Sequence, residues 1–223
     1  CGKTALESPA ACCGDLYFIH HFDENTPLEI TLRALDDLVR QGKILYPAVS
    51  NFAAWQIMKG LGISRQLGLS RFEVIQPMYN LVKRQAEVEI LPLAASEGLA
   101  VTPYSPLGGG LLTGKYGPDK MPEKGRIVNN QLYSTRYGED WMFKTAKAFA
   151  QLAKELEVAP AALAVRWVAH HPAVTAPIIG ARNLDQLEES LSSTKIDMTD
   201  DLYQRISSLS PKPAIATDRM EEQ

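Results

Sequence analysis

From residue 15 onward the sequence repeats one unit, in which a short apolar run, a turn and an amphipathic segment of helical spacing are followed by a glycine. Alternating strand and helix signals are typical of parallel α/β architecture, because a crossover helix returns the chain to the start of the next parallel strand. The pattern predicts five strands, at residues 16–21, 44–51, 72–76, 99–106 and 174–180.

The first unit is the most clearly specified. In its strand, Leu16, Phe18 and His20 share one face and the intervening residues share the other, because successive side chains alternate. The stretch from Thr26 to Glu29 then has the residue types of a capping box, with a proline at the first helical position, and Gly42 ends the helix.

The remaining helices are expected from apolar spacing and from glycine or proline boundaries. They are predicted at residues 53–67, 84–97, 139–156, 160–171 and 184–192, with a final amphipathic helix behind a Thr199 cap. Residues 107–137 form a long stretch without a clear period, and we expect it to be irregular.

Two fold types share this alternation. A doubly wound dinucleotide fold normally has Gly-x-Gly-x-x-Gly after its first strand, and no such motif occurs here. Gly108, Gly109 and Gly110 follow a strand but do not open a clean helix, so we interpret them as a flexible turn. The Gly-Lys-Thr at residues 2–4 lacks the upstream glycine and strand of a phosphate loop.

Composition is that of a globular protein, with 45% hydrophobic residues, 22% charged residues and a formal net charge of −3. Scattered basic residues argue against nucleic acid as a partner, and no apolar run is long enough to span a bilayer, so we expect no membrane partner and a cytoplasmic location. The three cysteines, Cys1, Cys12 and Cys13, lack the spacing of a disulfide framework or a zinc site, and we expect no metal.

Five stretches together resemble the aldo-keto reductase superfamily. They occur in the order DLYFIHHFD, AVSNF, IQPMYNLVKR, VTPYSPLGGGLLTGKY and PIIGARNLDQLEESL, and the resemblance extends from Asp15 to about Pro211. It implies an α/β fold, the (β/α)8 TIM barrel, and NADPH-dependent reduction of aldehydes and ketones. A small-molecule carbonyl compound is then the expected substrate.

The resemblance places the family's active-site histidine at His20, which answers to the Leu-Tyr-x-x-His pattern. A neutral imidazole there would donate a hydrogen bond to the substrate carbonyl oxygen, where charge grows as hydride arrives. His21 is then expected to face away from the barrel. Without the resemblance, a histidine at a strand end is more simply a structural residue.

For the cofactor, NADP(H), the resemblance implies two groups of residues. At the nicotinamide end, the carboxamide would be bound by Ser50, Asn51 and Gln76, and the ring would stack on Tyr104. The pyrophosphate would be bound around Ser105 and Leu107. Those at the adenosine end are Gly180, Arg182, Gln186 and Glu189.

Each of these roles has a simpler alternative. The nicotinamide carboxamide is a primary amide, which needs hydrogen-bond donors and acceptors in fixed positions, and Asn and Gln side chains supply both. Ser50 and Asn51 equally suit a helix cap. Tyr104 would stack on the nicotinamide ring or be a core aromatic. Arg182 would hold the 2′-phosphate, favouring NADP over NAD, or be a solvated surface residue.

In family order, the strand with His20 is the fourth of eight. The expected fold is therefore an aldo-keto reductase barrel truncated to its C-terminal five βα units, with residues 1–14 as an atypical N-terminal segment and 15–223 as a partial NADP-binding barrel. The absent strands would carry the family's catalytic aspartate, tyrosine and lysine. Unpaired sheet edges would then favour a homo-oligomer.

Three possibilities remain open on the sequence. The first is an NADPH-dependent carbonyl reductase, impaired by loss of the N-terminal catalytic residues or rebuilt at the acid position. The second is a catalytically silent nucleotide-binding or interaction protein derived from a reductase barrel. The third is a fragment of a longer gene product that is competent only when completed.

Overall fold

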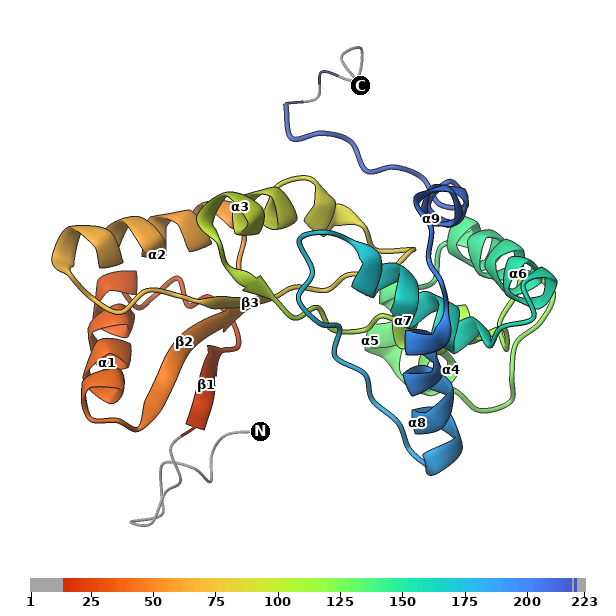
Figure 1. The fold of residues 1–223 in the computed structure, drawn as a ribbon, viewed down its shortest axis with the longest axis horizontal. Coiled ribbons are helices and arrows are strands. Elements are labelled where there is room, and N and C mark those ends of the chain that lie inside the picture. Colours follow the sequence, from red (N-terminus) through yellow and green to blue (C-terminus); the bar gives the residue numbers. More distant parts are fainter. Residues whose placement is uncertain (1–13, 218, 220–223) are drawn as a thin grey trace. The chain divides into compact units, whose positions relative to one another are not determined.

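The computed structural model describes residues 14–217 and residue 219 of the chain (Figure 1). These residues form two compact units. Unit 1 takes in the chain up to Pro77 together with Glu89–Thr102, and unit 2 takes in Met78–Val88 together with the chain from Pro103 onward. The predictions made for the three cysteines, and for residues 1–13 of the N-terminal segment, lie outside the described residues.

The sheet lies in unit 1 and is parallel throughout, which confirms the α/β class. Its strands are β1 (Gly14–Ile19), β2 (Ile44–Ser50), β3 (Val74–Gln76) and β4 (Ala100–Val101). They are hydrogen-bonded in the order β1-β2-β3-β4, so each strand pairs with the next one along the chain. The order contains no reversal, whereas a doubly wound sheet has one.

Three helices connect these strands: α1 (Leu28–Arg40), α2 (Ala54–Leu67) and α3 (Ile90–Glu97). Helix α1 packs on β2 and on α2, and α2 packs on α3, so the helices follow one another around the sheet as in Figure 1. Gly68 and Gly98 follow α2 and α3 at φ 65°, a left-handed conformation that glycine adopts without steric cost. The predicted glycine stops are confirmed at both positions.

The predicted capping box at the start of α1 is wrong. Pro27 occupies the N-cap position, and the helix end has no side-chain cap. Thr26 instead donates its hydroxyl to Asp23 Oδ2 at 2.6 Å, and Glu29 pairs with Arg33 one turn along the helix. Because the helix begins at Leu28, Thr26 lies one residue before the N-cap position, and its side chain belongs to the turn at Asp23.

The predicted fifth strand, at residues 174–180, does not form. This segment has no strand assignment, although Ile178 N donates to Pro103 O at 2.8 Å. A parallel ladder needs N–H donors at alternate positions on both chains, and Pro103, which accepts this bond, has no N–H to donate in return. The truncated barrel of five βα units is corrected to four hydrogen-bonded strands among the described residues, and β4 is shorter than its predicted range.

Unit 2 is largely helical. It contains α6 (Asp140–Glu155), α7 (Pro160–His170), α8 (Leu184–Leu191) and α9 (Asp200–Ser207), close to the predicted ranges. Thr199 Oγ1 accepts from Leu202 N at 3.2 Å, which confirms the predicted cap. Residues 107–137 are less irregular than expected, since they include α4 (Arg126–Asn129), α5 (Gln131–Arg136) and the 3-10 turn η2 (Gly108–Thr113). The predicted helix at 84–97 is likewise divided into η1 (Gln85–Glu87) and α3.

The core of unit 2 surrounds the buried Trp167 of α7. Its ring lies 5.2 Å from that of Tyr79 and 5.6 Å from that of Tyr203. Tyr79 donates its hydroxyl to Glu87, which also pairs with Arg84 at 2.9 Å, so the buried charges are matched within this cluster. In the part of the chain that the structure describes, no helix is long and apolar enough to cross a membrane.

Candidate functional site

The carboxyl ends of β2 and β3 are tied together by Ser50. Its side chain is 1% exposed, and Oγ donates a hydrogen bond of 2.9 Å to the main-chain oxygen of Gln76, its register partner. Because paired residues of neighbouring strands project their side chains to the same face, the Gln76 side chain lies beside that of Ser50. Two of the predicted carboxamide ligands are therefore brought together.

Asn51 extends this arrangement to the end of β1. Its Nδ2 donates to His20 O at 2.9 Å and to Ser50 Oγ at 3.1 Å. Asn51 has φ 57°, in the left-handed region, which asparagine tolerates better than most residues. Neither Ser50 nor Asn51 caps α2, whose N-cap is Ala53, with its N–H bonded to Gln56 Oε1. The helix-cap interpretation is therefore wrong.

His20 directly follows β1 and is exposed. Its ring meets that of the exposed His21 edge-on, with a centroid distance of 4.4 Å. The main chain of His20 is fixed by Asn51, so the predicted catalytic histidine and two predicted cofactor ligands belong to one hydrogen-bonded group in unit 1. The role of His20 in catalysis stays a prediction.

Thr102 is a polar residue of this region that the sequence reasoning missed. It follows β4, and the register of Ile75 with Val101 places it opposite Gln76. Its Oγ1 is buried and has no hydrogen-bond partner among the described residues. The signal was available in the sequence, since alternation along the predicted strand 99–106 would put Thr102 and Tyr104 on one face.

In unit 2, a buried asparagine shapes the loop that holds Tyr104 and Ser105. Asn80 is fully buried, and its Nδ2 donates to Ser105 O at 3.0 Å and to Tyr137 Oη at 3.3 Å. Ser105 has φ 59°, and this left-handed conformation turns the chain toward Leu107. Such strain persists only where neighbouring contacts enforce it. Burial raises the pKa of the half-buried Tyr104 phenol, with nearby Arg136 opposing the shift, so the ring stays neutral near pH 7.

The triple glycine lies in the 3-10 turn η2, which follows Leu107. All three glycines have positive φ, between 56° and 98°. A side chain at Gly109 would collide with Tyr133, and one at Gly110 would crowd Lys115. The ring of Tyr133 in turn lies between the guanidinium groups of Arg126 and Arg136, at 5.2 and 5.5 Å.

Three cations therefore lie near the turn after Leu107. Lys115 belongs to the same stretch of sequence and lies beside Gly110. Arg126 and Arg136 could not be found from a motif, because they reach this turn through the ring of Tyr133, which packs on Gly109.

The residues predicted for adenosine lie before and within α8, with Glu189 in its last turn. Asn183 caps this helix by accepting from Gln186 N at 3.0 Å, and the Gln186 side chain accepts from Arg182 N at 3.1 Å. The Arg182 side chain is exposed and forms no ion pair with another described residue. Gly180 is exposed and Glu189 is partly buried, so all four residues gather on the same short segment.

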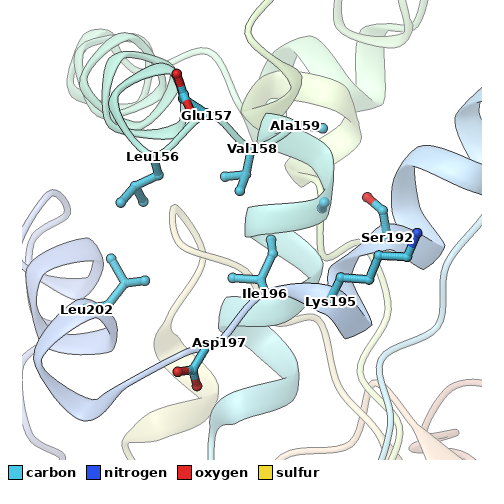
Figure 2. Close-up of a pocket in the computed structure, with 10 residues that line it drawn as sticks. Leu156, Glu157, Val158, Ala159, Ser192, Lys195, Ile196, Asp197 and Leu202 are labelled. Atoms are coloured by element: carbon cyan, nitrogen blue, oxygen red, sulfur yellow. The ribbon is translucent and has the colours of Figure 1, made fainter.

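A pocket of about 420 Å³ lies elsewhere in unit 2 (Figure 2). Leu156, Val158, Ile196 and Leu202 supply its apolar walls, and Lys195 and Asp197 lie at its rim. None of the predicted site residues lines it. Within residues 14–217 and at residue 219, no three His, Cys, Asp or Glu side chains are grouped so as to hold a metal ion.

Comparison with known proteins identifies the family of the chain. The model of the Aldo/keto reductase family matches residues 11–211. The chain belongs to this family. The matched range includes the stretches around His20, Ser50, Gln76 and Tyr104, and the roles of these residues stay predictions.

Individual relatives agree with this membership. The chain is 33% identical over 202 residues to the uncharacterized oxidoreductase YrpG of Bacillus subtilis, covering 89% of this chain and 59% of that protein. It is 35% identical over 208 residues to mouse aflatoxin B1 aldehyde reductase member 2, covering 86% and 57%. It is 33% identical over 185 residues to a probable voltage-gated potassium channel subunit beta of Arabidopsis thaliana, covering 82% and 56%. The chain thus spans less than three fifths of the length of these curated relatives.

Proposed function

We propose that the chain is the cofactor-binding part of an oxidoreductase that uses NADP(H) to reduce an aldehyde or ketone to an alcohol. The observation that carries this proposal is the hydrogen-bonded group of His20, Ser50, Asn51 and Gln76 at the carboxyl ends of three consecutive parallel strands. Parallel α/β folds form their ligand sites at this end of the sheet. Membership of the aldo/keto reductase family supports the same reaction.

The residues of unit 1 suit the nicotinamide end of the cofactor. A pyridine carboxamide needs both hydrogen-bond donors and an acceptor, and the amide of Gln76 offers both. Gln76 is partly exposed, and the buried Thr102 hydroxyl beside it has no partner among the described residues. Polar groups at the strand ends therefore fit the carboxamide.

The residues of unit 2 suit the phosphates. Left-handed glycines expose the main chain after Leu107, and Lys115, Arg126 and Arg136 supply positive charge there. Arg182, without an ion-pair partner in the described chain, suits the 2′-phosphate that distinguishes NADP from NAD. These features support NADP(H), with Tyr104 as the aromatic that stacks on the nicotinamide.

When bound, the reduced nicotinamide supplies the hydride. The role proposed for His20 is to donate a hydrogen bond from its neutral imidazole to the substrate carbonyl oxygen, which gains negative charge during the transfer. Asn51 holds the main chain of His20 in place for this contact. We further propose that the four-stranded sheet is part of a (β/α)8 barrel, because consecutive parallel pairing is the order that a closing barrel requires.

The alternative is a silent nucleotide-binding or interaction protein. It is favoured by one observation, that one relative at 33% identity is named as a potassium channel subunit beta. The first experiment titrates the purified chain with NADPH and NADH by fluorescence, and then follows NADPH consumption with a panel of aldehydes and ketones. Binding with turnover supports the reductase, binding without turnover supports the silent protein, and no binding of either nucleotide contradicts both.

We also propose self-association through β1. No described strand pairs with its outer edge, and Leu16 and Tyr46 are 42% and 50% exposed on the adjoining face. An open edge with exposed apolar residues is a surface that a second chain can extend. Sedimentation velocity over a range of concentrations tests this, and a monomer at all concentrations would contradict it.

A further inference from the structure

Thr102 has a buried hydroxyl with no hydrogen-bond partner in the described part of the chain. A buried polar group without a partner is costly, and native proteins contain few of them. In the same part of the chain, only the hydroxyl of Tyr116 shares this property. The position of the Thr102 hydroxyl therefore calls for an explanation.

Its position in the sheet is well defined. The register of β2 with β3 pairs Ser50 with Gln76, and that of β3 with β4 pairs Ile75 with Val101, so that Gln76 is opposite Thr102. The three side chains thus form a row on one face, with neighbouring strands about 4.8 Å apart. This row crosses the carboxyl ends of three consecutive strands.

Some hydrogen-bond donors of the row already have acceptors within the chain, and others are left for a ligand. The Ser50 hydroxyl proton is directed to Gln76 O, and both N–H bonds of Asn51 Nδ2 are directed to acceptors inside unit 1. Gln76 is partly exposed, and the hydroxyl of Thr102 has no described partner. These two groups are the donors left for a ligand at this face.

We propose that the Thr102 hydroxyl is a further ligand of the cofactor's carboxamide, acting beside Gln76. A hydroxyl can donate to the carboxamide oxygen or accept from the carboxamide N–H. Thr102 can therefore form a hydrogen bond to the carboxamide in addition to those that Gln76 forms. Binding would then satisfy the hydroxyl that is unpaired in the free chain. This inference rests on the proposed function, because it requires a nicotinamide nucleotide at this face.

The test compares two ligands and three variants. Thr102→Val removes the hydroxyl at nearly constant shape, Thr102→Ala removes it with loss of volume, and Thr102→Ser retains it. Dissociation constants are measured by fluorescence or calorimetry for NADPH and for adenosine 2′,5′-bisphosphate, which lacks the nicotinamide. Thr31→Val in α1 is the matched control for a partly buried threonine away from the row.

We expect Thr102→Val and Thr102→Ala to weaken NADPH binding by about 3- to 10-fold, the usual effect of one hydrogen bond. Binding of the bisphosphate should be unchanged in both variants, and Thr102→Ser should bind NADPH within about twofold of the wild type.

Three outcomes would overturn the inference. Unchanged NADPH binding by Thr102→Val and Thr102→Ala overturns the role of Thr102 and leaves the proposed function intact. An equal loss for both ligands shows a general structural effect and also overturns it. A wild-type chain that binds neither ligand contradicts the proposed function itself, and the role of Thr102 with it.

Discussion

Ser50 and Gln76 are register partners on β2 and β3, and the Ser50 hydroxyl donates to the Gln76 main-chain oxygen at 2.9 Å. This bond fixes the end of the shortest central strand against its neighbour. It also fixes the starting point of the Gln76 side chain, on which the proposed carboxamide site depends. The stability of the sheet and the geometry of the site are thus linked through one hydroxyl.

Replacement of Ser50 by alanine should affect both properties. We expect a loss of about 1 kcal/mol in the free energy of unfolding, because a buried acceptor loses its partner, and a severalfold weaker affinity for NADPH. Urea unfolding and nucleotide titration measure the two effects. Ser208→Ala, at an exposed serine bonded within its own turn, is the control and should change neither. If Ser50→Ala bound NADPH with the affinity of the wild type, the Ser50–Gln76 hydrogen bond would not be needed for the proposed carboxamide site.

Arg182→Gln should reduce the preference for NADPH over NADH. Loss of a charge-assisted bond to the 2′-phosphate costs about 1.5–3 kcal/mol, so NADPH affinity should fall about 10- to 100-fold while NADH affinity is unchanged. Arg33→Gln removes an exposed guanidinium that pairs with Glu29 in α1, and serves as the control. Paired titrations at two salt concentrations check the result, and parallel losses for both nucleotides would assign Arg182 to a different contact.

The half-buried His171 should make stability depend on pH. Burial lowers the pKa of its imidazole below the ordinary value of 6.5, with Glu87 opposing this shift and Arg84 adding to it. Between the lowered folded value and 6.5, the unfolded chain binds a proton that the native chain does not. The contribution of His171 to the free energy of unfolding should therefore be fully present above about pH 6.5, and it should decrease as the pH falls below that value.

His171→Asn tests this dependence. In the native chain Ala173 N donates to His171 Nδ1 at 3.2 Å, and an asparagine oxygen can accept in its place while nothing titrates. Urea unfolding between pH 5 and pH 8 should show a shallower pH dependence in the variant than in the wild type. Identical slopes would mean that other groups cause the loss of stability in acid.

Two glycines of α2 offer a matched pair. An alanine at Gly62 meets nothing within 4 Å, whereas a Cβ at Gly60 would lie 2.5 Å from Cε2 of the buried Phe72. Both substitutions gain about 0.5–1 kcal/mol of helix propensity. We expect Gly62→Ala to be stabilising by this amount and Gly60→Ala to be destabilising, as measured by thermal or urea unfolding. A stabilising Gly60→Ala would show that Phe72 can move aside.

The sequence allowed much of the architecture to be predicted. Spacing of apolar residues located most of the helices, and Gly68 and Gly98 marked two ends correctly because a left-handed residue after a helix nearly requires glycine. Local patterns failed where a competing partner was available. Thr26 bonds to Asp23 instead of capping α1, and Pro103 lacks a donor that a fifth strand would use.

The candidate site divides in the same way. The stretches around His20, Ser50 and Tyr104 could be assigned from short motifs, because neighbouring residues carry the signal together. Arg126 and Arg136 could not, since they reach the glycine turn through the packing of Tyr133. Asn80 was also unassigned, although it holds Ser105 from 25 residues away.

By itself, the sequence determined the parallel α/β class, the membership of a family and the residues at the strand ends, because these depend on local spacing and on contiguous motifs. The tertiary structure alone decided which strands pair, which donors are already used within the chain and which remain for a ligand. The physical reason is that a hydrogen bond between residues such as Ser50 and Gln76 depends on strand register, and register is set by packing across the whole sheet.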